Sequence, residues 1–115
     1  MPPIDLSTAL SATDGDVDLL REVIRSFLDE YPRLLIELAN AIELGDFARV
    51  RRASHTIKGT LRIFGDLSAR EIAGELEEMG KTECLTLADA KCKSLKLSLA
   101  ALHQQLADKL RGGLA

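Results

Sequence analysis

The sequence predicts an all-α protein: an antiparallel four-helix bundle with a short additional helix at its N-terminus. Apolar residues recur at helical spacing in every long segment, and no segment shows sustained alternation of apolar and polar residues. The connections between these segments are short, which favours antiparallel neighbours. With 115 residues, the chain has the length of one domain with one core. We therefore expect a single domain over residues 1–115, a core at about 5–110 and a frayed tail at 111–115.

The first two helices follow from capping signals and apolar periodicity. Residues 5–11 can form a short first helix, and Asp14 or Asp16 can cap the second. The apolar positions of the second helix keep their phase across Pro32, so we expect one kinked helix rather than two separate helices. These apolar positions are Leu20, Val23, Ile24, Phe27, Tyr31, Leu34, Leu35, Leu38 and Ile42.

A third helix is expected at about residues 47–64. Gly45 can end the helix before it, and Asp46 can cap its first turn. Gly65 can end it in turn. One side of this helix is apolar and forms a core stripe, which consists of Val50, Ala53, Ser54, Ile57, Leu61 and Phe64.

Two further helices complete the bundle. The spacing of Ser68 and Glu71 is that of a capping box, for a helix that reaches Met79 and Gly80. Its buried side is expected to consist of Ile72, Ala73, Leu76 and Met79. The last helix is expected to start near Thr86, which has a similar spacing to Asp89. Its apolar positions are Ala88, Cys92, Leu95, Leu99, Leu102, Leu106 and Leu110.

Composition excludes several classes of protein. With 46% hydrophobic and 29% charged residues, the chain is typical of soluble globular proteins. A net charge of −3 and a pI near 5.4 argue against nucleic acid as a partner. No apolar run approaches the roughly 18 residues of a membrane span, and residues 1–5 lack the features of a signal peptide. We therefore expect a cytoplasmic protein without membrane contact by this segment.

The two cysteines predict neither a disulfide scaffold nor a metal site. Cys84 and Cys92 are eight positions apart, and neither their spacing nor their neighbours resemble a redox pair or a zinc site. Cys92 is in register with the leucines of the last helix, so we expect it to be a core thiol.

His55 lies on the face of the third helix opposite the core stripe, together with Arg51, Lys58, Gly59 and Arg62. A titratable nucleophile is therefore expected to project into solvent from the middle of a helix. The other histidine of the chain, His103, has no basic cluster or glycine around it, and we expect it to be an ordinary surface or boundary residue.

The third helix contains five cations against one acid, Asp46, although the chain as a whole is acidic. We expect this positive charge to disfavour a protonated imidazole at His55 and to stabilise a phosphoryl group attached to it. Lys58 is the cation nearest to His55 in the helical register. The cations are Arg49, Arg51, Arg52, Lys58 and Arg62.

Gly59 is unexpected in the interior of a helix, where glycine costs about 1 kcal/mol relative to alanine. Close packing against another helix often explains such a glycine. Here Gly59 lies one turn after His55 on the outward face, where packing within the chain is not expected. We interpret it as clearance that lets the active site of a partner approach the imidazole.

The sequence contains no complete catalytic site. It has no acidic metal cluster, no phosphate-binding glycine loop and no nucleophile–base pair at a supporting spacing. Glu71, Glu75, Glu77 and Glu78 are interpreted as a solvated acidic face that can pair with neighbouring cations. Phosphoryl transfer also needs a metal, a positioned donor and charge neutralisation. We therefore expect a phosphoryl carrier without autonomous catalysis, with the missing groups supplied by a partner.

These residues resemble the histidine-containing phosphotransfer (HPt) domain family of multistep phosphorelays. Its pattern is a histidine, then lysine and glycine at the third and fourth following positions, then a further glycine, as at His55, Lys58, Gly59 and Gly65. The resemblance extends over roughly residues 5–110. Its other matching segments are 27–32 and 41–46 before the motif and 76–80 after it.

The resemblance implies a four-helix bundle whose exposed histidine exchanges a phosphoryl group with receiver-domain aspartates. It implies that His55 is the phosphoacceptor, that Lys58 stabilises the phosphate, that Gly59 permits approach and that Gly65 is structural. It also implies no intrinsic cofactor, because Mg²⁺ is held at the receiver-domain site. The implied partners are response-regulator receiver domains and a hybrid sensor histidine kinase. We expect the protein to be a monomer.

The sequence departs from the family pattern just after Gly59, where small or polar residues are common. Arg62 and Ile63 lie on or beside the His55 face and would change the docking surface. Ile63 can give an apolar contact to a receiver, and Arg62 can contact the phosphoryl group or an acidic partner. Arg51 and Arg52 complete the expected docking residues.

Two alternatives remain open at this point. One is a helical module that binds receiver or kinase domains without transferring phosphate. The other is a fragment of an autophosphorylating histidine kinase, which is disfavoured because 115 residues contain no nucleotide-binding segment. The modified imidazole nitrogen is also open, although the nitrogen farther from the backbone is more accessible.

Overall fold

The computed structural model describes residues 4–113, and within this range it contains helices and no strand. The prediction of an all-α bundle with an additional N-terminal helix is confirmed. The elements are α1 (Ser7–Ala12), α2 (Val17–Leu44), α3 (Phe47–Leu61), the 3₁₀ helix η1 (Arg62–Phe64), α4 (Leu67–Lys81) and α5 (Ala88–Gly112).

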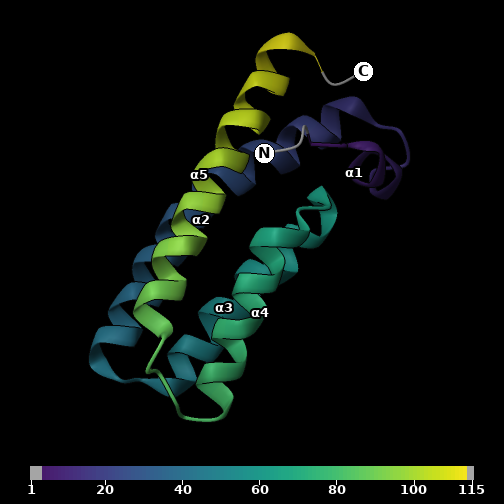
Figure 1. Cartoon of the computed structure of the whole chain (residues 1–115). Helices are drawn as coiled ribbons and strands as arrows, with labels where there is room; N and C mark the ends of the chain where they lie inside the picture. The colour runs from purple at the N-terminus through teal and green to yellow at the C-terminus, as the bar shows by residue number, and fades with distance from the viewer. Residues whose placement is uncertain (1–3, 114–115) are drawn as a thin grey trace.

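The four principal helices pack as two pairs of unequal length (Figure 1). α2 and α5 have 28 and 25 residues, whereas α3 and α4 have 15 residues each. Each helix contacts two others: α3 lies between α2 and α4, and α5 lies between α4 and α2. The short α1 packs against η1 and α2 beyond the end of α3. The long helices extend the molecule to 43 × 24 × 20 Å.

The same capping device begins three of the helices. Asp16, Asp46 and Asp66 each accept a hydrogen bond from the backbone N–H three residues later, over 3.0–3.1 Å. This bond satisfies a donor that would otherwise have no partner in the first turn. Gly45 and Gly65 end the preceding elements at φ values of 67° and 66°, in the left-handed region that glycine adopts without strain. Asp16 is thus the cap of α2, and Asp46 and both glycine stops act as predicted.

Two predicted caps are wrong. The capping box at Ser68 does not form, because Asp66 already caps α4 and Ser68 is exposed within its first turn. α5 does not start with a cap at Thr86: it begins at Ala88, and Leu87 at the capping position makes no side-chain hydrogen bond.

The long helices otherwise follow the expected course. α2 continues unbroken through Pro32, so a single helix is confirmed. α5 extends to Gly112, into the segment predicted to fray, while residues 114–115 of that segment lie outside the described residues.

The core consists of the apolar stripes of the four helices, closed at one end by α1. The predicted stripe residues of α3 are all buried, and Leu20, Ile24 and Leu38 of α2 are fully buried. Cys92 is half-buried against the core, and burial raises the pKa of its thiol. Cys84 is exposed, and both cysteines are free. Cys92 thus packs against the core as expected, but it is half-buried rather than enclosed within the core.

α3 and α4 approach most closely at Gly80. A methyl group added there would lie 2.8 Å from the backbone nitrogen of Arg51 and 2.9 Å from the backbone oxygen of Phe47. Side chains do not tolerate such distances to backbone atoms, so only glycine fits. One and a half turns earlier, Gly74 faces the side chain of Lys58, with 3.6 Å to its Cδ atom from the corresponding methyl position. These contacts set an antiparallel register between the two helices.

We predict opposite effects of alanine at two helical glycines. Gly80→Ala should lower the free energy of unfolding by about 1–3 kcal/mol, because the added methyl overlaps the α3 backbone. Gly59→Ala should raise it by up to about 1 kcal/mol, because nothing lies within 4 Å of the added methyl and alanine favours the helix. Urea denaturation monitored by circular dichroism measures both changes. Equal effects would contradict the close α3–α4 approach.

Candidate functional site

His55 projects from the exposed side of α3, as the helical wheel predicted. The opposite side of the helix is held in the core by Val50, Ile57 and Leu61, which are fully buried. The side chain of His55 is 66% exposed. Packing of the apolar stripe therefore fixes the orientation of α3 and presents the imidazole to solvent.

A carboxylate from α4 binds the inner nitrogen of this imidazole. The Nδ1 atom of His55 lies 2.7 Å from Oε2 of Glu77. The other oxygen, Oε1, accepts a hydrogen bond of 2.5 Å from Nζ of Lys58. Only 7% of the Glu77 side chain is exposed. The expectation that Glu77 is solvated is thus wrong, because the close approach of α4 to α3 buries it between the two helices. The expected pairing with a neighbouring cation is confirmed at Lys58.

Glu77 is ionised in this environment. Burial raises the pKa of its carboxyl group, but the hydrogen bonds and charges of Lys58 and His55 outweigh burial and hold the pKa below its ordinary value. An ionised carboxylate accepts hydrogen bonds and donates none, so the hydrogen of this contact resides on Nδ1 of His55. Nε2 is then the nitrogen left with a lone pair in a neutral ring, and it is the one farther from the backbone.

Lys58 shares the carboxylate with His55. Its side chain is 26% exposed, and its aliphatic part passes close to Gly74 of α4. A methyl group at Gly74 would lie 3.6 Å from Cδ of Lys58, which is an ordinary van der Waals distance. Lys58 is therefore held near the imidazole by a specific partner, and its ammonium group lies within the same hydrogen-bonded cluster.

The other predicted site residues are arranged around this cluster. Arg51, Arg52 and Arg62 are exposed, and within residues 4–113 none of them forms an ion pair. Ile63 is half-buried and packs against the core, so it is less available than a surface residue. Gly65 ends η1 in the left-handed conformation, which agrees with a structural role.

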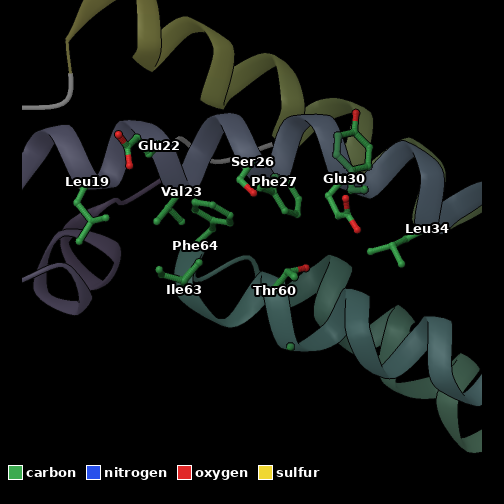
Figure 2. Close-up of a pocket in the computed structure, with 12 residues that line it drawn as sticks. Leu19, Glu22, Val23, Ser26, Phe27, Glu30, Leu34, Thr60, Ile63 and Phe64 are labelled. Carbon is green, nitrogen blue, oxygen red and sulfur yellow. The ribbon is translucent and has the colours of Figure 1, made fainter.

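Gly59 borders a groove between α2 and the end of α3, which we call the α2–α3 groove (Figure 2). Its volume is about 510 Å³. Nothing lies within 4 Å of a methyl group placed on Gly59, so no packing inside the chain requires glycine here. This confirms that Gly59 is open on the outward face.

His103, expected at the surface or boundary, lies half-buried on α5. Its Nδ1 atom is 2.6 Å from the hydroxyl oxygen of Tyr31 on α2, and the two rings meet edge-on. It lies outside the His55 cluster, and its bond to Tyr31 joins the two long helices.

Two further observations concern the residues from 4 to 113. None of the helices described there is both long and apolar enough to cross a membrane. No three histidine, cysteine, aspartate or glutamate side chains in that range are grouped so as to hold a metal ion.

One known protein family matches most of the chain. The Hpt domain family matches residues 22–112, a range that includes the complete His55 cluster. The chain belongs to the Hpt domain family. Hpt domains carry phosphoryl groups on a histidine between proteins of a phosphorelay, so the function of the chain is histidine phosphotransfer. As a class they are carriers rather than enzymes.

Solved structures share the Hpt fold over nearly the whole chain. Histidine-containing phosphotransfer protein B (HptB) from Pseudomonas aeruginosa PAO1 superposes with a TM-score of 0.89 at 20% identity, covering 98% of both chains. The HPT domain of a sensor hybrid histidine kinase from Shewanella superposes with a TM-score of 0.81 at 17% identity, covering 97% of both. No curated protein sequence matches the chain. At these identities the two structures establish the fold.

Glu77 is the site residue that the sequence analysis missed, although the sequence contained a signal. Glu77 is four positions after the buried Ala73 and three before Gly80, which lies against α3, so it falls on the buried side of its helix. A charged residue on a buried helical stripe needs a partner. The expected electrostatic environment of His55 contained only cations. The structure adds the carboxylate of Glu77, which is the charged group in direct contact with the ring.

We predict that Glu77→Gln removes a pH-dependent contribution to stability. The pKa of Glu77 is lowered from 4.5, so its ionised form stabilises the folded protein at neutral pH, and this stabilisation is lost as pH falls through the lowered value. Wild type should therefore exceed the variant in unfolding free energy at pH 7, with the difference shrinking toward pH 3. Urea denaturation across this range tests it. Glu78→Gln changes an exposed neighbouring acid and should show no such pH-dependent difference from wild type. If the unfolding free energies of Glu77→Gln and wild type changed in parallel with pH, the argument from burial would be contradicted.

Proposed function

We propose that Nε2 of His55 accepts a phosphoryl group from the aspartyl phosphate of a receiver domain and later passes it to another receiver domain. The observation that supports this assignment most directly is the contact of Nδ1 with Glu77, at 2.7 Å. It leaves the outer nitrogen of an imidazole that is 66% exposed free to meet a partner.

The proposed step balances without a further reactant. The lone pair of Nε2 attacks phosphorus, the phosphorus–oxygen bond of the aspartyl phosphate breaks, and the electron pair leaves with the aspartate carboxylate. Nδ1 keeps its proton, so the ring becomes positively charged as the new bond forms. The carboxylate of Glu77 lies against this proton and compensates the charge. The reverse step returns the phosphoryl group to a second aspartate.

Lys58 is proposed to stabilise the transferred group. Its ammonium group shares Glu77 with the imidazole, and its side chain is partly exposed, so it can turn toward a phosphoryl oxygen while staying in the cluster. Arg62 is exposed one turn beyond Gly59 and is proposed as a second cation for the phosphoryl group or for an acidic partner surface.

The remaining chemistry is proposed to come from the partner. In-line phosphoryl transfer uses a divalent cation, and we assign Mg²⁺ to the acidic site of the receiver domain. Hpt domains work with receiver domains and hybrid histidine kinases, which makes both classes the proposed partners of this chain. Gly59, Arg51 and Arg52 are proposed to meet the receiver. We propose that the chain acts as a monomer in the cytoplasm.

Incubation with a phosphorylated receiver domain and Mg²⁺ tests the assignment of His55. Acid-labile phosphate should appear on the wild type and on His103→Gln, but not on His55→Gln. Nitrogen-15 NMR should place the phosphoryl group on Nε2. Label on His55→Gln would refute the assignment, and binding of the receiver without transfer would favour the interaction module. Label taken directly from ATP would favour a kinase fragment.

Gly59→Leu should slow transfer from the receiver at least tenfold while the bundle stays folded. The added side chain points into open space, so it obstructs the approach of a partner without disturbing the core. Stopped-flow or quenched-flow transfer rates measure the effect, and circular dichroism checks the fold. Ala48→Leu adds an equally apolar side chain at an exposed position in the first turn of the same helix and serves as the control. Similar rates for both variants would remove the clearance argument.

A further inference from the structure

A separate cavity lies at the end of the bundle that carries α1, and we call it the α1–α5 pocket. It is bounded by the N-terminal segment with α1, by the turn between η1 and α4, and by the second half of α5. Figure 1 shows α1 beside the turn that leads from η1 into α4. The volume of the pocket is about 910 Å³, within the range of roughly 300–1,000 Å³ that is usual for small-molecule sites. His55 and its partners do not line this pocket, so it is distinct from the site already described.

Part of the lining of the α1–α5 pocket is apolar. Phe64 and Leu102 are buried, and Ile4 and Ala101 are half-buried. Leu97 of α5 also lines the pocket and is 73% exposed, although it is a large apolar residue. A ligand with an aliphatic chain would remove this apolar surface from water, which is favourable. The lining therefore favours a ligand that has an aliphatic part.

Among the described residues, every charged side chain that lines this pocket is a carboxylate. These are Asp5, Asp66 and Glu71, and none of them forms an ion pair within residues 4–113. Asp5 and Glu71 are exposed. Asp66 uses its Oδ1 atom to cap α4, whereas its Oδ2 atom is buried and has no hydrogen-bond partner in the same range. Buried polar atoms are rarely left in this state. A positively charged group in the pocket would compensate the charge of this carboxylate.

The carboxylates are spread along the pocket. On α5 the pocket extends from Leu97 to Gln105, eight positions or about 12 Å. Because α4 and α5 are antiparallel neighbours, Glu71 lies toward Leu97 and Asp66 lies toward Gln105. The residue before Asp5 donates its backbone N–H to Oε1 of Gln105 over 2.6 Å, so Asp5 also lies toward Gln105. No three acidic side chains within residues 4–113 are grouped so as to hold a metal ion. This distribution of charge matches an extended cation better than a compact one.

We propose that the α1–α5 pocket binds a linear aliphatic polyamine such as spermidine. A molecule of this class carries several ammonium groups at intervals along a methylene chain. The ammonium groups pair with the carboxylates of Glu71, Asp66 and Asp5, and the methylene groups cover Leu97 and the apolar lining. Binding forms no covalent bond and does not involve His55, so the inference is independent of the proposed phosphotransfer.

Two features of the lining favour a polyamine over other cations. A monoamine would leave two of the three carboxylates without a partner, and a metal ion would cover no apolar surface. The hydroxyl groups of Thr8, Ser68 and Ser98 also line the pocket and can accept hydrogen bonds from ammonium groups. A polyamine uses the charged, the polar and the apolar parts of the lining together.

Isothermal titration calorimetry of the full chain with spermidine tests the proposal through two matched pairs of variants. Glu71→Gln removes a charge from the pocket, whereas Glu78→Gln removes the charge of an exposed acid of α4 that does not line it. Leu97→Ser removes an exposed apolar side chain from the pocket, whereas Ile36→Ser does the same on α2, at a residue that is 63% exposed. All four positions are exposed, so the bundle should stay folded, which circular dichroism checks.

Glu71→Gln should weaken spermidine binding about fivefold, which is the effect of losing one exposed ion pair. Leu97→Ser should weaken it about threefold through the loss of apolar contact. Both controls should bind as wild type does. Added salt should diminish the effect of Glu71→Gln, because salt screens exposed charges, whereas that of Leu97→Ser should persist. In nitrogen-15-labelled protein, spermidine should shift the amide signals of Ser98 and Ala101 and leave that of His55 in place.

Equal losses of affinity in the pocket variants and in their controls would overturn the proposal, because spermidine would then bind to the net negative charge of the chain alone. Tighter binding of Mg²⁺ or of butylamine than of spermidine would overturn it too, since an extended polycation would not be preferred. So would tighter binding of a lysine-rich peptide, which would make the occupant a protein segment. His55→Gln should bind spermidine as wild type does, so failure of the phosphotransfer assay leaves this inference standing.

Discussion

The close contact between the α3 and α4 backbones at Gly80 is the constraint on which the site depends. No side chain separates the helices there, and Gly80 lies directly against the α3 backbone at Phe47 and Arg51. Glu77 lies one turn before Gly80, and this register brings its carboxylate to Nδ1 of His55 rather than to solvent. A wider separation would expose Glu77 to water and leave the imidazole free to rotate. The α3–α4 interface thus contains both the close backbone contact at Gly80 and the Glu77–His55 hydrogen bond, and the first makes the second possible.

One buried carboxylate orders the polar part of the site. Glu77 binds both His55 and Lys58, which are themselves only one turn apart, so a single acid sets the orientation of an imidazole and of an ammonium group. The exposed arginines around them act at longer range and are screened by salt. The two kinds of charge therefore act differently: the buried carboxylate positions individual atoms, whereas the exposed arginines contribute only to the general positive potential of this face.

Most of the fold could be predicted because the apolar stripes alone determine which helix faces are buried. The N-caps were harder: Asp66 and Ser68 both satisfy the local rule for capping α4, and the choice between them depends on where the turn after Gly65 places the chain. His55 and Gly59 were found because both are unusual on an exposed face. Glu77 was missed because its role depends on the distance between two helices, which no local pattern encodes. The groove beside Gly59 could not be predicted for the same reason, because its walls come from separate helices.

The placement of His55 and Glu77 on adjacent helices also bears on folding. The two residues are 22 positions apart, whereas Tyr31 and His103, which join the long helices, are 72 apart. Closing a short loop costs less conformational entropy than closing a long one, and local contacts form faster. The contacts that orient the imidazole of His55 can therefore form within a helical hairpin of the nascent chain, before α5 has been synthesised. Assembly of the polar site need not wait for completion of the bundle.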